Sequence, residues 1–249
     1  MANIELLAVE NTLSRKKTGH QQNLKFLLAV ENTDRNKQVD VIWAGHDGVW
    51  HTLPAEYQGP RGDHQEFWQA CVSVNARLAK KLPGDIRFAL CLRCHGDEFW
   101  DNNQGWNHHC RQGSGLTLTG ELPLQNLSFK QHLEDDQQFA SIKVALPPGI
   151  TADSVFVHWT RDNWRHSQQT LCHRDKRQKP EGAQIWSARL KVQDTFALEY
   201  SICCKTRYQE LWDNNFGRNY RLSRSPLKVM ILNLHCYQEE QQDYKLSQI

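Results

Sequence analysis

The sequence predicts an all-β protein built from two similar antiparallel β-sandwiches. Short segments of alternating apolar and polar residues recur along its 249 residues, separated by turns rich in Gly, Pro, Asn and Asp, which is typical of sandwiches and barrels. No stretch shows a sustained 3.6-residue apolar period, so helix is expected to be minor. The segment WDNNQGWN at 100–107 also returns as WDNNFGRN at 212–219, which indicates an internal duplication.

Tryptophans mark the two halves in the same order. The first half carries Trp43, Trp50, Trp68 and Trp100, and the second half carries Trp159, Trp164, Trp186 and Trp212. The repeated turn begins at residues 100 and 212, close to half the chain apart. We therefore predict one domain over residues 1–117 and a second over residues 118–249, with the boundary in the Gly-, Ser- and Thr-rich segment 112–122.

The strands follow in order from this pattern. Alternation predicts strands at 24–31, 39–43, 67–74 and 86–92 in the first half, and at 139–146, 155–159, 185–192 and 196–202 in the second. Residues 74–82 are expected to give one helical turn or a short helix. A final strand is expected at 227–236, and the polar tail from residue 238 is expected to fray.

Charge and composition exclude several classes of partner. The chain has 30 basic and 28 acidic residues, a net charge of +2, so no strong field attracts nucleic acid or an anionic membrane. The basic run at 174–179 is better explained as a solvated loop. No apolar stretch approaches the ~18 residues that span a bilayer, and the N-terminus lacks the pattern of a secretory signal. We therefore expect a cytoplasmic protein whose eight cysteines are reduced thiols.

The repeated turn also suggests a family. The pattern W-D-N-N-x-G-x-N-Y, with V-x-V-x-W and D-x-W upstream, resembles carbohydrate-binding module family 21. These are the starch- and glycogen-binding domains of fungal glucoamylases and of glycogen-targeting subunits of protein phosphatase 1. The resemblance covers most of each half. It implies tandem immunoglobulin-like sandwiches of roughly 100 residues each, no catalytic activity, no cofactor, and binding of α-1,4-glucan such as glycogen, starch or a maltooligosaccharide.

The resemblance also implies a set of sugar-contacting residues. In the first half they are Asn32, Lys37, Trp50, Trp100, Asn102 and Asn107. In the second half they are Trp164, Trp212, Asn214, Asn219 and Tyr220. His108 stands where the family has the tyrosine that Tyr220 retains. The second half reads PPGITAD where the first has Asn32 and Lys37, so its site is expected to be weaker or differently built.

The residue types themselves suit sugar recognition. An exposed indole covers the C–H face of a glucose ring, and an Asn amide both donates to and accepts from neighbouring hydroxyls. Trp50 and Trp164 follow turns that contain Asp and are expected to be exposed. Trp100, Trp212 and the unpaired Trp106 could equally be platforms or packed residues. Four tryptophans inside alternating strands are expected to lie in the cores: Trp43, Trp68, Trp159 and Trp186. The residues expected mainly to shape the turns are Asp101, Asn103, Asp213 and Asn215.

Three other functions were compared with glucan binding. A glycosidase requires two carboxylates across a cleft, but the acidic run at 134–136 has no partner in the pattern. Cys91, Cys94, His108, His109 and Cys110 are zinc-ligand types, yet residues three apart on a strand face opposite sides. A scaffold that brings an enzyme to the polymer or to another protein is the strongest alternative. The phosphatase-docking segment expected of such relatives is absent, and Lys228-Val229-Met230-Ile231 is its nearest match.

Overall fold

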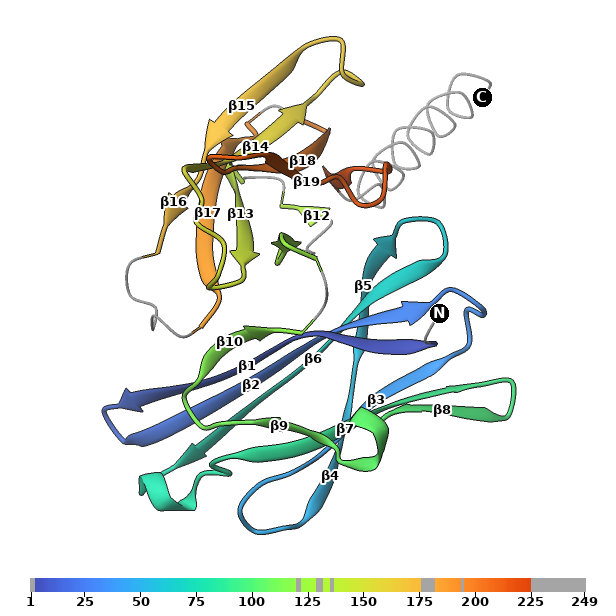
Figure 1. Ribbon diagram of the computed structural model, residues 1–249, viewed down its shortest axis with the longest axis vertical. Helices are drawn as coiled ribbons and strands as arrows, with labels where there is room; N and C mark the ends of the chain where they lie inside the picture. Colours follow the sequence, from blue (N-terminus) through green and yellow to red (C-terminus); the bar gives the residue numbers. More distant parts are fainter. Residues whose placement is uncertain are drawn as a thin grey trace, which may run out of the picture.

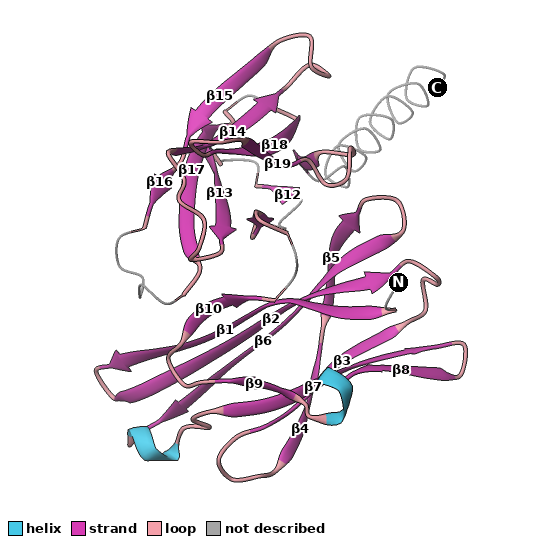
Figure 2. Cartoon of the chain, viewed as in Figure 1, coloured by secondary structure: helices cyan, strands magenta, loops and turns pink. Residues whose placement is uncertain are grey.

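The chain is almost entirely β-strand. The computed structural model describes residues 3–119, 122–128, 132–134, 137–175, 182–193 and 195–224 (Figure 1). Within these ranges helix is limited to two 3₁₀ turns, η1 (Ala79–Lys81) and η2 (Asn103–Gly105) (Figure 2). The all-β prediction is confirmed. The single helical turn expected within 74–82 is η1, while residues up to Ala76 continue a strand.

The first half forms an antiparallel sandwich of two sheets. One sheet has the order β10-β1-β2-β6-β5, and the other has the order β4-β3-β7-β8 with β9 also paired to β7. The strands are β1 (Ile4–Lys16), β2 (Gly19–Glu31), β3 (Gln38–Ala44), β4 (Trp50–Pro54), β5 (Glu56–Arg61), β6 (Gln65–Ala76), β7 (Ile86–Cys94), β8 (Asp97–Asp101), β9 (His108–Cys110) and β10 (Gly115–Leu118). Alternate side chains of the two sheets meet in a core where Phe26 and Phe88 pack edge to face, with ring centroids 4.9 Å apart.

The second half repeats this arrangement. Its sheets have the orders β11-β13-β17-β16 and β12-β20-β18-β14-β15, with β19 also paired to β18. The strands are β11 (Gln125–Asn126), β12 (His132–Leu133), β13 (Phe139–Leu146), β14 (Ser154–Thr160), β15 (Ser167–Leu171), β16 (His173–Arg174), β17 (Gln184–Lys191), β18 (Ala197–Lys205), β19 (Glu210–Asp213) and β20 (Tyr220–Arg224). Strands β3, β4, β7, β8 and β9 thus correspond in order and pairing to β14, β15, β18, β19 and β20.

The two sandwiches share one apolar interface. In β2, residues 26–30 are all buried, although alternate residues of a strand point to opposite faces. Phe26, Leu28 and Val30 enter the first core. Leu27 and Ala29 instead join the apolar cluster of the second sandwich. The sheet containing β1, β2 and β6 is therefore covered on both faces, which explains the continuous apolar run FLLAV in this strand.

Most predicted strands are present, with a few differences. Strand β1 was not predicted, because residues 6–9 are all buried and a register shift between Leu6 and Ala8 interrupts their alternation. The predicted domain boundary at 117/118 falls inside β10, which pairs with β1 of the first sandwich. The strand expected at 227–236 and the tail from residue 238 lie outside the described residues.

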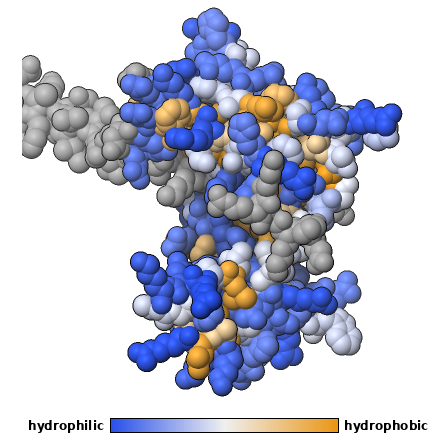
Figure 3. Space-filling model, turned by 90° about the vertical axis from the view of Figure 1, so that its left-hand side faces the viewer, coloured by the Kyte–Doolittle hydropathy of each residue, from blue (hydrophilic) through white to orange (hydrophobic). Residues whose placement is uncertain are grey.

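The surface carries no single continuous apolar face in the view of Figure 3. Two lobes meet at a narrower waist, and hydrophobic residues form scattered patches among hydrophilic ones. Among the described residues, no helix is long and apolar enough to cross a membrane.

Candidate functional site

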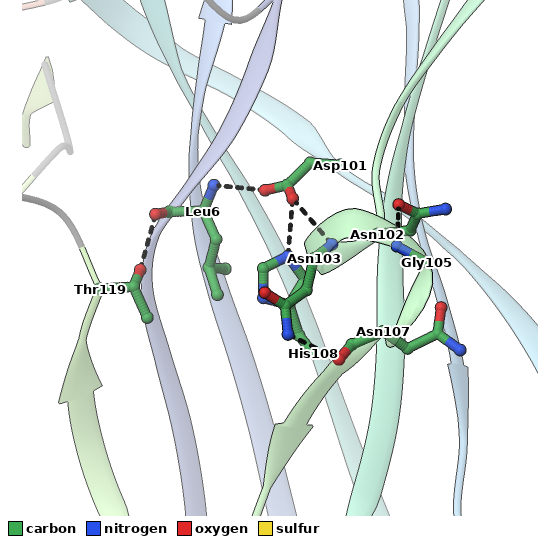
Figure 4. Close-up of polar contacts among 8 residues, drawn as sticks. All are labelled: Leu6, Asp101, Asn102, Asn103, Gly105, Asn107, His108 and Thr119. Atoms are coloured by element: carbon green, nitrogen blue, oxygen red, sulfur yellow. Dashed lines mark hydrogen bonds and ion pairs between the residues drawn. The ribbon is translucent and has the colours of Figure 1, made fainter.

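The first copy of the repeated turn is held by bonds within the turn itself (Figure 4). The Asn102 Oδ1 atom accepts a hydrogen bond from the Gly105 backbone at 3.0 Å, and Asn103 Nδ2 donates to the Asn107 carbonyl at 3.2 Å. Asn103, Gln104 and Asn107 all have positive φ angles, which Asn tolerates better than most residues. The motif is Asn-rich because this backbone requires it, and Asn103 is a turn former as predicted.

Asp101 fastens this turn to the sandwich. Its carboxylate accepts bonds from the Leu6 backbone at 3.3 Å and the Asn103 backbone at 3.3 Å, and it lies 2.9 Å from His108 Nε2. Burial alone would raise the pKa of Asp101, but the bonds from His108 and the two amides outweigh it and lower the pKa. An ionised Asp101 in this position is a structural anion, in agreement with the predicted role.

One tryptophan of the turn stands on the outer face of the sheet β4-β3-β7-β8. Trp100 is directly opposite Cys91, which is opposite Asp40, which is opposite Pro54. Directly opposed residues share a face. Cys91 is fully buried while Trp100 is 47% exposed, so the indole lies over the sheet with one side open. Its Nε1 donates to Glu98 at 3.4 Å.

Trp50 lies on the same face at its other end. It pairs with Ala44, four residues beyond Asp40 on β3, which corresponds to about 13 Å along the strand. The register row between those of the two indoles consists of Ile42, Ala89 and Thr52. Trp50 is 46% exposed. Two open indoles therefore flank a strip of short side chains.

The Asn32–Lys37 segment is divided between surface and interior. Asn32 is exposed, and its backbone donates to the His64 carbonyl at 2.8 Å. The Lys37 side chain is only 1% exposed; its ammonium pairs with Glu66 at 2.9 Å and donates to the Glu31 carbonyl at 2.9 Å. Lys37 is therefore a structural ion-pair residue, and the expected sugar contact is corrected on this point.

The outer face of the second sandwich repeats the register of the first with different residues. Trp212 is opposite Cys203, then Phe156, then Leu171. Phe156 and Leu171 thus replace Asp40 and Pro54. Trp212 is 49% exposed and packs against His158 with ring centroids 4.8 Å apart. At these positions the second face is more apolar than the first.

The loop between β14 and β15 presents Trp164. Asp162 accepts bonds from the Thr160 hydroxyl at 2.9 Å and from the His166 backbone at 2.9 Å, and Trp164 Nε1 donates to Glu199 at 2.9 Å. The bond from the His166 backbone, followed by those from the His166 ring and Thr160, lowers the pKa of Asp162 to about 2. Trp164 is 37% exposed. It lies in the connection between β14 and β15, which corresponds to the connection between β3 and β4 that ends at Trp50.

The last residue of the motif faces inward in both sandwiches. The Tyr220 ring stacks on Tyr200 at 5.2 Å, and its hydroxyl donates to Asp213 at 2.7 Å. His108 likewise stacks on Phe88 at 5.2 Å. Tyr220 is 8% exposed, so it supports the turn from below, and the expectation that it faces sugar is corrected.

The remaining predicted residues divide by exposure. Trp106 is 85% exposed, Asn214 is exposed, and Asn102, Asn107 and Asn219 are half-buried. The Asn214 Oδ1 atom caps Gly217 at 3.0 Å, as Asn102 caps Gly105, so each of these amides has its oxygen committed to the turn. Of the tryptophans predicted as core residues, Trp43 and Trp159 are buried, whereas Trp68 and Trp186 are half-buried against the cores.

The zinc ligand types do not gather into a cluster. Cys91 lies beneath Trp100 on the outer face, while Cys94 packs against the first core, as expected for residues three apart on a strand. In the part of the chain that the structure describes, no group of three or more His, Cys, Asp or Glu side chains is placed to hold a metal ion.

Sequence reasoning missed the carboxylates beside the tryptophans. Glu98 bonds Trp100 and pairs with Arg93 at 2.6 Å, and Glu210 pairs with Lys205 at 2.9 Å beside Trp212. The signal was present, because Glu-x-Trp precedes both turns, at Glu98 and at Glu210. Phe156 and Leu171 carried no comparable signal, since a strand pattern does not reveal which face remains open.

Comparison with known proteins finds a family similarity in the second sandwich. Residues 151–223 match the family model described as carbohydrate/starch-binding module (family 21). These residues run from the start of β14 to β20 and include the second tryptophan face. This part of the second half is therefore similar to carbohydrate-binding modules of family 21.

Individual relatives are more distant. Protein phosphatase 1 regulatory subunit 3B of Danio rerio is 24% identical over 147 residues, covering 56% of this chain and 46% of the relative, so the chain spans about half of that protein's length. The starch-binding domain of Rhizopus oryzae glucoamylase, solved with β-cyclodextrin and maltoheptaose, has a TM-score of 0.35 at 20% identity, covering 45% of this chain and 95% of that domain. The carbohydrate-binding module of the muscle glycogen-targeting subunit of protein phosphatase-1 has a TM-score of 0.32 at 20% identity, covering 45% of this chain and 76% of that module.

Proposed function

We propose that the protein is a non-catalytic binder of α-1,4-glucan that uses one exposed tryptophan face on each sandwich. The observation that carries this proposal is the repeated register: Trp100 and Trp212 stand over buried Cys91 and Cys203 at equivalent places in two sheets. Half-exposed indoles above flat strand surfaces suit the C–H faces of glucose rings. Trp50 and Trp164 extend the two faces, and Trp106 adds a further open indole on the first turn.

The polar partners in this proposal are amides near the turns. The turns fix the backbones of Asn102, Asn107, Asn214 and Asn219, so these amides are held near the tryptophans before any ligand binds. Asn32 supplies an exposed amide on the first sandwich. Lys37 and Tyr220 are not part of the proposed sites, because their polar atoms are already bonded inside the protein.

A targeting role is the second candidate. The similarity to a protein phosphatase 1 regulatory subunit supports it, and a glucan binder that also holds an enzyme would carry that enzyme to the polymer. The nearest match to a phosphatase-docking segment, at 228–231, lies outside the described residues. A cytoplasmic location remains part of this proposal, because the cysteines within the described residues are free thiols, as suits a reducing compartment.

Affinity electrophoresis in gels containing glycogen or amylopectin tests glucan binding. Wild type should be retarded, and Trp100→Ala or Trp212→Ala should each weaken binding by about tenfold, or about 1.4 kcal/mol, through loss of the stacking surface. Tyr57→Ala and Phe139→Ala are matched controls, since these aromatics are 51% and 41% exposed but lie on the opposite sheets. Migration of wild type unaffected by either polymer would refute the proposal.

A further inference from the structure

The two copies of the turn differ at two positions. In the second copy, the residues at both positions contact the first sandwich. Gln104 and Trp106 of the first copy are replaced by Phe216 and Arg218 in the second. Gln104 and Trp106 are exposed. Phe216 and Arg218 are also exposed, but each contacts the first sandwich: the Arg61 guanidinium lies 4.8 Å from the Phe216 ring centroid, and Arg218 pairs with Asp63.

The Asn residue that shapes each turn also behaves differently in the two copies. Asn103 is exposed and bonds within its own turn. Asn215 is 3% exposed and makes the equivalent bond within its turn, from Nδ2 to the Asn219 carbonyl at 3.3 Å. It also bonds the hairpin between β5 and β6: its Oδ1 accepts from the Gly62 backbone at 3.0 Å, and its Nδ2 donates to the Pro60 carbonyl at 3.2 Å. The side-chain amide of Asn215 thus bonds the second turn directly to the backbone of the first sandwich.

The hairpin is shaped to receive the turn. Gly62 has a φ of +60°, and a Cβ atom there would lie 3.0 Å from Phe216 Cβ, so both the backbone and the contact favour glycine. In Figure 1 the turn that follows β19 lies beside the loop that follows β5. A second attachment lies elsewhere, where the Ala183 backbone donates to the Leu116 carbonyl at 2.9 Å.

We propose that the second turn is an inter-module clasp that fixes the second tryptophan face relative to the first, so that the protein engages polymeric glucan through both faces at once. This inference rests on the proposed glucan binding and names its ligand class: a polymer with many accessible chains, in preference to a short oligosaccharide. The Ala183–Leu116 bond and the shared apolar interface join the sandwiches, and the clasp sets the orientation of the second tryptophan face relative to the first. Binding of the second face then becomes intramolecular, at an effective concentration set by a fixed geometry.

A double variant of the clasp provides the test. Phe216→Gln with Arg218→Asp removes the ring beneath Arg61 and opposes Asp63 with a like charge. Gln is compatible with the backbone at this position, because Gln104 adopts nearly the same φ in the first turn. Adding Asp63→Arg restores an opposite pair. Gln104→Phe, which makes the matching change in the undocked turn, is the control.

The measurements are retardation by glycogen and calorimetric affinity for maltoheptaose, on full-length protein. The clasp variant should lose at least about tenfold in apparent glycogen affinity while its maltoheptaose affinity stays within about twofold. Asp63→Arg should recover part of the loss, and Gln104→Phe should behave as wild type. Unchanged glycogen affinity in the clasp variant, or an equal loss for both ligands, overturns the clasp. Wild type that binds neither ligand overturns the proposed function itself.

Discussion

The same residue type acts differently in the two turns because its neighbours differ. Asp101 is bonded by His108 and two backbone amides, which lower its pKa. Asp213 occupies the equivalent position, but burial dominates and raises its pKa despite bonds from Tyr220, Asn215 and Asn126. The charge on Asp101 therefore favours folding at neutral pH, whereas the charge on Asp213 opposes it. The unfavourable burial of Asp213 occurs in the turn that contacts the first sandwich, whose Arg61 lowers the pKa of Asp213 only in part.

Lys37 provides a test at the scale of a single residue. Lys37→Met should destabilise the protein by about 3 kcal/mol, because Glu66 and the Glu31 carbonyl lose a buried cationic partner. Glucan affinity of the remaining folded protein should be unchanged. Chemical denaturation and glycogen retardation measure the two effects, with Asn32→Ala as the opposite case: stability retained and affinity reduced. If Lys37→Met lost glycogen affinity while keeping its stability, Lys37 would have to be counted among the glucan-binding residues.

Residue types in the sequence identified the turn formers but not the state of every polar side chain. Asp101 and Asn103 were predictable because a turn rich in Asn and Gly restricts its own backbone. The burial of Lys37 and Tyr220 was not, since it depends on Glu66 and Tyr200, which lie outside their motifs. A family resemblance shows which positions correspond in sequence. Whether the side chain at such a position is exposed depends on the residues that pack around it in the fold.

The conformation of the loop that carries Trp164 depends on the carboxylate of Asp162. Asn163 and Trp164 both have positive φ angles, a conformation that is unfavourable for a bulky side chain. Asp162 compensates by accepting bonds from Thr160 and from the backbone and ring of His166. The Trp164 part of the second tryptophan face is therefore carried by a loop that Asp162 and the Thr160 hydroxyl hold together, whereas Trp50 begins a strand.

This loop should respond to acid. The pKa of Asp162 is lowered from 3.8 to about 2, so the ionised group stabilises the loop above pH 3.8 and loses that effect as the pH falls through about 2. The Trp164 indole NH resonance should shift over this range in parallel with the Asp162 carboxyl titration, both followed by NMR. Asp162→Asn should remove the transition. A Trp164 resonance that titrates equally in the variant would show that another group controls the loop.

At the scale of the whole molecule, the sequence predicted the duplication but not the apolar interface between the two sandwiches. Repeated tryptophans and the repeated turn indicate two sandwiches, because each half carries its own alternating pattern. The shared interface is less visible in the sequence. The run FLLAV in β2 signals burial on both faces, but it does not say that the second face meets another sandwich. That contact is made by Leu27 and Ala29, which join the second core.

The shared interface predicts that damage in one sandwich is felt in the other. Leu27→Ala should lower the free energy of unfolding by about 2–5 kcal/mol, since Leu27 is 3% exposed and packs in the cluster of the second sandwich. Hydrogen exchange followed by mass spectrometry should show faster exchange in peptides from β13 and β18 as well as from β2. Leu13→Ala is the control, because Leu13 is 47% exposed. Faster exchange confined to the first sandwich would mean that the two halves unfold independently, and the fixed orientation required for bivalent binding would then lack its structural basis.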